Sequence, residues 1–245
     1  MPTPDAVIRA EIDRLARGRG ASGVSLLEIM VVVAIIGAVI AVTMPSMERL
    51  FENQRIKGAA RAGADLLLLA RSEAIRTGTP HVVFFGVDPD GTTMTDPNGG
   101  FAPLLVLNDS VTQNCRIDAN ELTEAMVADG DEISWGSVLA TGKVTSDTGG
   151  ETLPSFTPPS APPPSGSTYK DPNGTGRMDW VMFRPDGMPV AFDGDSGDCG
   201  NVGPAGQGGG AIYITNGKRD YSVVISPLGN VRVHVWQPNA NSWSS

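Results

Sequence analysis

The stretch GVSLLEIMVVVAIIGAVIAVTMP, residues 23–45, is the densest apolar run of the chain. Between Gly23 and Pro45 lie 21 residues, and Glu28 is the only charged one. As a helix they would span about 31 Å, close to the roughly 30 Å of a bilayer's hydrocarbon core. The sequence therefore predicts a membrane-spanning helix over residues 24–44. Glu28 then requires an explanation, because placing a charge in hydrocarbon costs about 2.5 kcal/mol or more.

The segment before the apolar run, residues 1–23, holds four arginines and has a net charge of +1. The positive-inside rule places such a segment in the cytoplasm and the rest of the chain on the far side of the membrane. The apolar run is longer than that of a secretory signal, and no A-x-A cleavage site follows it. This arrangement favours cleavage before the apolar run rather than after it.

The segment G-VSLLE-IMVVVAIIG resembles the class III signal of type IV pilins and pseudopilins. In that family a prepilin peptidase cuts after the glycine at the cytoplasmic face, and the new amino terminus is N-methylated. The resemblance makes Gly23 the last leader residue and Val24 the methylated first residue of the mature chain. Gly37 and Pro45 also match the family pattern. The chain departs from it at Val24, where Phe or Met is more usual, and in a leader longer than many.

Glu28 becomes the fifth mature residue, which is where the family has its glutamate. A carboxylate at this distance can pair with the amino terminus of a neighbouring subunit in a filament. Attraction between opposite charges in a medium of low dielectric constant offsets their desolvation. We interpret Glu28 as an assembly contact; the alternative is a charge tolerated near the membrane interface, where the penalty is small.

The helical pattern continues beyond Pro45, with apolar and charged residues at helical spacing. We predict one helix, Val24–Thr77, kinked at Pro45 and stopped by the Gly and Pro that follow it. Residues 45–78 form its periplasmic amphipathic half in this interpretation. We expect the Leu66–Leu69 face to pack against a sheet of the same domain rather than against a coiled-coil partner.

Residues 79–245 are predicted to form a β-rich periplasmic domain. Short apolar runs separated by turn signals indicate antiparallel strands. The predicted strands are His81–Val87, Phe101–Asn108, Ile133–Val138, Trp180–Arg184, Val190–Phe192, Ala211–Thr215, Tyr221–Ser226 and Val231–Trp236. A Pro/Ser-rich loop, residues 157–168, interrupts them. The predicted fold class is α+β, a long N-terminal helix packed on antiparallel sheets in the manner of a pilin.

Two C-terminal segments resemble the core of the pseudopilin H/FimT domain. They are WVMFRPDGMPV, residues 180–190, and RDYSVVISPLGNVRVHVW, residues 219–236. The pairs Asp186-Gly187 and Gly229-Asn230 supply the positive φ angles that tight hairpin turns need. Residues 88–179 carry no motif that points to a known family.

Charge and cysteine content limit the classes of partner and cofactor. From residue 79 onward, 19 acidic and eight basic residues leave a net charge of −11, so we expect no nucleic-acid partner. Two cysteines, Cys115 and Cys199, are too few for a metal site made of thiolates alone. Outside the cytoplasm they could form one disulfide, which the sequence leaves open because it does not show the distance between them.

Enzyme signatures are weak. His81 and His234 lie in predicted strands, and their spacing defines no catalytic constellation. The glycine-rich residues 203–211 lack the Lys-Ser/Thr of a phosphate-binding loop and open no helix. Three aspartates, Asp193, Asp195 and Asp198, form a weak Ca²⁺ candidate, for which a solvated acidic turn is the default interpretation. We expect no cofactor and no reaction.

Together the resemblances imply a minor pseudopilin of the H type in a type II secretion system. Such a subunit spans the inner membrane once, is cut by prepilin peptidase, and joins other pilin-like subunits in a periplasmic filament that drives protein export. The alternative is a FimT-like minor pilin of a type IV pilus, concerned with pilus assembly or DNA uptake; the acidic body counts against it. A third hypothesis is a monomeric, membrane-anchored periplasmic enzyme.

Overall fold

The computed structural model divides into two compact units, Met1–Arg49 and Leu50–Ser245. It describes residues 24–87, 89, 91, 104–109, 114–116, 122–126, 134–150, 152–155, 166–194 and 198–245. The leader predicted for residues 1–23, including Gly23, lies outside these ranges. The division at Arg49 falls about one helical turn beyond the end of the predicted membrane segment.

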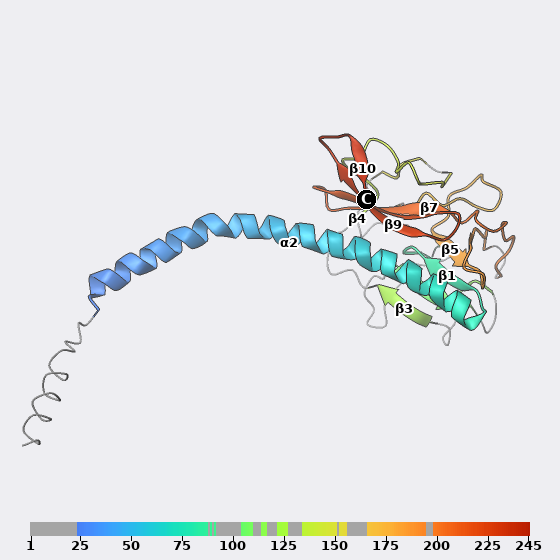
Figure 1. Ribbon diagram of the computed structural model, residues 1–245, viewed down its shortest axis with the longest axis horizontal. Helices are drawn as coiled ribbons and strands as arrows, with labels where there is room; N and C mark the ends of the chain where they lie inside the picture. The colour runs from blue at the N-terminus through green and yellow to red at the C-terminus, as the bar shows by residue number, and fades with distance from the viewer. Residues whose placement is uncertain are drawn as a thin grey trace, which may run out of the picture. The chain divides into compact units, whose positions relative to one another are not determined.

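Helix α2, Leu26–Thr77, is 52 residues long and belongs partly to each unit (Figure 1). Its first turn is closed by the carbonyl oxygen of Ser25, which accepts from the backbone N–H groups of Glu28 and Ile29 at 3.0 and 3.2 Å. The helix continues through Pro45 and ends at Thr77, as predicted, before Gly78 adopts a φ of 70°. Positive φ is the usual conformation of a glycine that terminates a helix.

Among the described residues of the second unit, antiparallel strands form two five-stranded sheets. The first sheet has the order β3 (Leu122–Met126), β2 (Leu104–Asn108), β1 (His81–Phe84), β5 (Trp180–Phe183), β6 (Pro189–Val190). The second has the order β10 (Ser242–Ser244), β9 (Val231–Gln237), β8 (Asp220–Ile225), β7 (Gly210–Thr215), β4 (Ser134–Trp135). The α+β class with antiparallel sheets is thus the one predicted.

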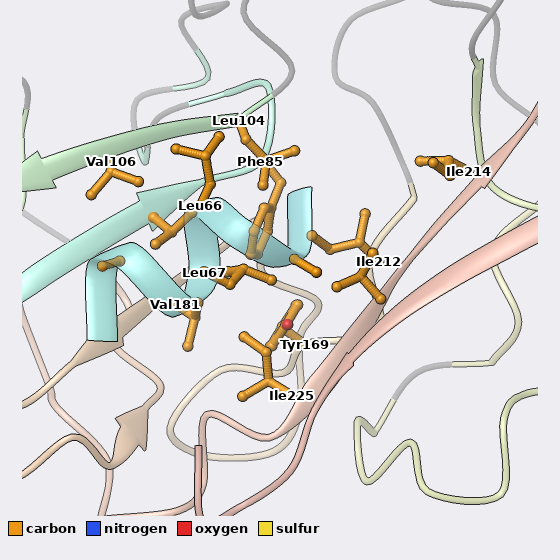
Figure 2. Close-up of a cluster of buried hydrophobic side chains, with 14 of the residues drawn as sticks. Leu66, Leu67, Phe85, Leu104, Val106, Tyr169, Val181, Ile212, Ile214 and Ile225 are labelled. Atoms are coloured by element: carbon orange, nitrogen blue, oxygen red, sulfur yellow. The ribbon is translucent and has the colours of Figure 1, made fainter. Parts of the chain in front are cut away.

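The second half of α2 and the two sheets share one hydrophobic core. Buried residues of the helix recur at intervals of three and four, at Ile56, Ala60, Ala64, Leu67, Ala70 and Ala74, and Leu66 is buried beside them. They pack with side chains of the first sheet, such as Val181, and of the second, such as Ile225. Figure 2 shows Leu66 and Leu67 among side chains from both sheets. This helix therefore covers one face of each sheet.

The opposite face of each sheet is also covered. Phe84 and Val190 of the first sheet pack with Cys115 and Phe192 from connecting segments. On the second sheet, Tyr213 belongs to a separate cluster of buried side chains. All residues of β1, β7 and β8 are buried as a result. Strands covered on both faces lack polar–apolar alternation, which accounts for the poor alternation of the strand that begins at His81.

Several strand bounds differ from the prediction. Strand β1 ends at Phe84 instead of Val87. The N–H of Phe85 still donates to the carbonyl of Asp179, but Gly86 has a φ of 80°, which takes the chain out of the extended conformation. Strand β4 holds two residues only, and it ends where Gly136 adopts a φ of 89°.

Other differences concern strands that were shifted or missed. Strand β6 starts and stops earlier than predicted, at Pro189–Val190. Strands β3 and β10 were not predicted. Residues 101–103 and 133, and most of the Pro/Ser-rich loop, lie outside the described ranges.

Candidate functional site

The start of α2 carries the residues that the resemblance singles out. Val24 lies two residues before the helix, and its side chain is 66% exposed. Glu28 is the acidic residue of the first turn. A negative charge at this end of a helix is stabilised by the unpaired N–H groups and the macrodipole.

Apolar side chains surround the first part of the helix on all sides. Every residue from 24 to 41 is exposed. The large hydrophobic side chains are 49% exposed at Val31 and Val32 and 76% exposed at Leu26. A helix that is hydrophobic around its whole circumference is normally covered by other helices or by lipid. Among the described residues, however, no helix is both long enough and apolar enough for a membrane span.

The second half of α2 is where the two C-terminal motifs meet. Arg71 donates from Nη1 to the carbonyl oxygen of Gly229 at 2.8 Å. Gly187 and Gly229 both have a φ of 77°, which confirms the positive φ predicted at these two turns. A Cβ at Gly187 would lie 2.7 Å from Cδ1 of Ile75, and one at Gly229 would lie 2.6 Å from the carbonyl oxygen of Gly187. The turns therefore need glycine for close approach to the helix as well as for φ.

A disulfide joins Cys115 to Cys199, with their Cα atoms 4.8 Å apart. The structure thus contains the bond that the sequence left open. Asp109, which sequence reasoning did not single out, is fully buried beside it. Its carboxylate accepts from the backbone N–H groups of Asn114 and Cys115, each at 3.0 Å. Asp109 thereby holds the backbone in place at Cys115, a non-glycine residue with a φ of 53°.

The acidic turn proposed as a weak Ca²⁺ candidate has its carboxylates directed to the backbone. Asp193 accepts from the N–H of Asn201 at 2.8 Å, and Asp198 from the N–H of Gly200 at 2.6 Å. Asp195 lies outside the described ranges. The structure does not bring Asp193 and Asp198 into a common set of ligands. Within the part of the chain that is described, the one such set of three residues is Asp109, Cys115 and Cys199.

Asp220 is a fully buried carboxylate that fixes a loop. It accepts from Oγ of Ser137 at 2.6 Å and from the backbone N–H groups of Leu139 and Ala140, both at 2.7 Å. Several hydrogen bonds to one carboxylate satisfy its acceptor sites in a buried place. The arrangement attaches the segment after β4 to the start of β8.

Asp147 has a comparable role on the outer face of the second sheet. Its carboxylate accepts from Oγ1 of Thr168 and from the hydroxyl of Tyr213, both at 2.9 Å. Burial, and next the charge of Asp147, raise the pKa of Tyr213. The phenol therefore stays protonated and donates to the carboxylate. These buried carboxylates are occupied by contacts that hold loops in position.

The two histidines lie in different sheets, as part of β1 and β9. Burial lowers the pKa of His81 and of His234 below the usual value of 6.5. Nδ1 of His81 lies 3.2 Å from the carbonyl oxygen of Thr79. The prediction that both are strand residues is confirmed, and the structure does not bring them together.

No protein-family model, no curated protein and no solved structure matches the chain.

Proposed function

We propose that the chain is a minor pseudopilin of a type II secretion system, a filament subunit and not an enzyme. Residues 1–23 would be a cytoplasmic leader removed by prepilin peptidase, residues 24–44 a segment stored in the inner membrane, and residues 79–245 a periplasmic domain. The observation that supports the proposal most strongly concerns the first part of α2. Its apolar residues from 24 to 41 are all exposed, and they directly follow a sequence that resembles a prepilin leader.

The exposed apolar helix supports storage in lipid followed by packing among sister helices. Both environments remove the same side chains from water, so transfer from one to the other changes apolar hydration little. Association within a membrane depends on van der Waals packing and polar contacts rather than on hydrophobicity. Assembly therefore needs a specific polar contact to set the register between neighbouring helices.

Glu28 supplies such a contact in this proposal. After cleavage, the methylated amino group of Val24 in a neighbouring subunit is a cation that can pair with the carboxylate. A charge pair away from water is sensitive to loss of either partner, since the remaining charge is left uncompensated. The chemistry requires a free amino group at Val24, which links assembly to cleavage of the leader.

The second unit supports a periplasmic location and a structural role. A disulfide between Cys115 and Cys199 is typical of an oxidising compartment. The buried carboxylates of Asp147 and Asp220 are engaged in bonds to hydroxyl and N–H groups that hold loops. We therefore assign no reaction to the chain, which is itself the substrate of the peptidase.

The decisive test compares Glu28→Gln with wild type in cells that contain prepilin peptidase and a secretion system. We expect both chains to insert in the inner membrane and to show Val24 as the N-terminus by mass spectrometry. Incorporation of Glu28→Gln into filaments, measured by crosslinking to other pilin-like subunits, should be lost. The matched control is Glu73→Gln on the same helix, which removes only an exposed ion pair with Arg76 and should assemble normally.

Two results would contradict the proposal. An intact leader on the wild-type chain would remove its basis, and normal incorporation of Glu28→Gln would show that the carboxylate is not an assembly contact. Incorporation of the wild type into a surface pilus alone would favour the alternative assignment as a FimT-like minor pilin.

A further inference from the structure

We propose that Asp109, Cys115 and Cys199 form a binding site for Zn²⁺ when the disulfide is open. The three residues come from separate places in the chain: the end of β2, the segment that follows it, and the segment after β6. Their potential ligand atoms lie within 4.8 Å of one another. The inference does not depend on the proposed role in a filament.

The spacing of sulfur and oxygen suits one tetrahedral ion. Sγ of Cys199 lies 3.6 Å from Oδ2 of Asp109. Two such ligands on one Zn²⁺, at about 2.3 Å for sulfur and about 2.0 Å for oxygen, would lie about 3.5 Å apart. The Cα atoms of the two cysteines are 4.8 Å apart, so rotation about χ1 lets both sulfurs reach the same ion.

The surroundings of Asp109 hold its carboxylate ready for a cation. The backbone N–H groups of Asn114 and Cys115 each donate to one carboxylate oxygen at 3.0 Å. A carboxylate has about four acceptor sites, so one that is oriented by backbone N–H groups can bind a metal as well. Hydrogen bonds of this kind orient metal ligands, and their loss commonly weakens affinity 10- to 100-fold, to order of magnitude.

The donor set selects the metal. Two thiolates and a carboxylate carry three negative charges in a place where Asp109 and Cys115 are fully buried. Soft thiolate ligands favour Zn²⁺ over the hard cations Ca²⁺ and Mg²⁺, which take oxygen ligands. Three protein ligands leave a fourth position for water, on the side of the partly exposed Cys199.

Zinc binding and disulfide formation exclude each other. Binding converts two thiols and Zn²⁺ into a zinc bis-thiolate and releases two protons. Oxidation instead transfers two electrons from the thiols to a disulfide such as oxidised glutathione, which forms the Cys115–Cys199 bond and two molecules of reduced glutathione. Because thiolates held by the ion are not free to attack the oxidant, Zn²⁺ should delay closure of the bond.

The test uses the full chain in detergent micelles, with the disulfide reduced by a phosphine. In this reduction the phosphine is oxidised to a phosphine oxide, and water supplies its oxygen and the two thiol protons. Isothermal titration calorimetry with Zn²⁺ in two buffers measures how many Zn²⁺ ions bind to each chain and how many protons are released. We expect one Zn²⁺ per reduced chain with release of close to two protons, and no uptake by the oxidised chain. Asp109→Asn should bind at least tenfold more weakly. Asp198→Asn, whose carboxylate adjoins Cys199 in the chain but bonds to Gly200, should bind like wild type.

A second measurement uses the wild type alone, which guards against a variant that does not fold. Excess Zn²⁺ should slow disulfide formation by oxidised glutathione at least tenfold, and a chelator should restore the rate. Equal uptake by reduced and oxidised chains, undiminished affinity in Asp109→Asn, or an unchanged oxidation rate would each overturn the proposal.

Discussion

Gly229 and Gly217 share a backbone conformation but differ in their surroundings. Their φ angles are 77° and 76°, in the region that favours glycine. A Cβ at Gly229 would lie 2.6 Å from the carbonyl oxygen of Gly187 and 3.0 Å from Nε of Arg71, whereas a Cβ at Gly217 would meet nothing within 4 Å. Substitutions at these two glycines therefore separate the effect of close atomic approach on stability from the effect of positive φ.

We expect Gly217→Ala to lower the free energy of unfolding by about 1 kcal/mol, the usual penalty for an L-residue in the left-handed region. Gly229→Ala should lose at least about 1 kcal/mol more, because the atom that it meets belongs to the backbone and cannot rotate away. Urea titration of the two variants against wild type measures both values. Equal losses would show that the turn does not need its close contact with the carbonyl oxygen of Gly187.

The histidines make stability depend on pH in a defined direction. Burial lowers the pKa of His81 and of His234, and at His234 the charge of Arg232 lowers it further. Below the unfolded value of 6.5, the unfolded chain therefore binds more protons than the folded one. The free energy of unfolding should be highest above that pH and fall as the pH falls through 6.5 toward the folded pKa values.

We expect His234→Gln to reduce this acid-dependent loss. Urea titrations near pH 7.5 and near pH 5.5, both approximate choices on either side of the transition, give the loss for variant and wild type. Glu73 and Asp171, with pKa values lowered by their hydrogen bonds to Arg76 and Thr175, titrate below this window and do not interfere. An equal loss in both chains would mean that His234 is accessible to protons when folded.

For single residues, the sequence predicts those roles that depend only on neighbours in the chain. The positive φ of Gly187 and Gly229 follows from turn chemistry, because glycine next to a polar residue is typical of hairpin turns. The bond from Arg71 to Gly229 joins residues 158 positions apart, and only the packed fold brings them together. Asp109 was missed for a related reason: its closeness to Cys199, 90 positions away, depends on how two connecting segments fold.

Among the elements, α2 shows what a sequence pattern can and cannot specify. The prediction assigned the whole Leu66–Leu69 segment to the buried face. Successive helical residues are about 100° apart, so four consecutive leucines surround most of the helix and cannot all face one sheet. The structure buries Leu66 and Leu67, leaves Leu69 partly buried, and exposes Leu68 by 44%. The prediction that this segment packs against a sheet was right, but the prediction of which leucines face the core was only partly right.

These adjacent leucines form a matched pair of test sites. We expect Leu67→Ala, at a fully buried position, to lower the free energy of unfolding by about 2–5 kcal/mol through lost burial and a cavity. Leu68→Ala should change it by less than about 0.5 kcal/mol, because Leu68 is an exposed residue outside the buried cluster. Thermal and urea unfolding would compare the two. A similar loss for both would place the helix in a different rotation from the one observed.

The missed strands have weak signals of their own. Strand β3, with the sequence LTEAM, contains glutamate, alanine and methionine, which are not typical of strands, and its pairing with β2 determines its conformation. Strand β10 has three residues and pairs only at the edge of its sheet, with β9. Where apolar β-branched residues dominate, as in β7, β8 and β9, prediction and structure agree to within one or two residues.

For the whole molecule, the order of the chain alone did not predict two sheets. The sequence indicated antiparallel strands, but a division between sheets depends on pairing, and β4 joins the second sheet although it lies before β5 in the chain. The shared core explains the stability of this arrangement, because the second half of α2 packs against residues of both sheets. Neither sheet would have its inner face covered without the helix.

The disulfide is the covalent constraint on this body, and its contribution can be measured. Cys115 and Cys199 are 84 positions apart, and closing a loop of that length in the unfolded chain contributes about 4.5 kcal/mol in the chain-entropy description. We expect the double variant Cys115→Ala, Cys199→Ala to lose about 2–5 kcal/mol of unfolding free energy in urea. Reduction of the wild type with a phosphine should produce a similar loss, and the reductant should leave the double variant unchanged. A loss below about 0.5 kcal/mol in both would show that the buried contacts around Cys115 hold these segments together without the bond.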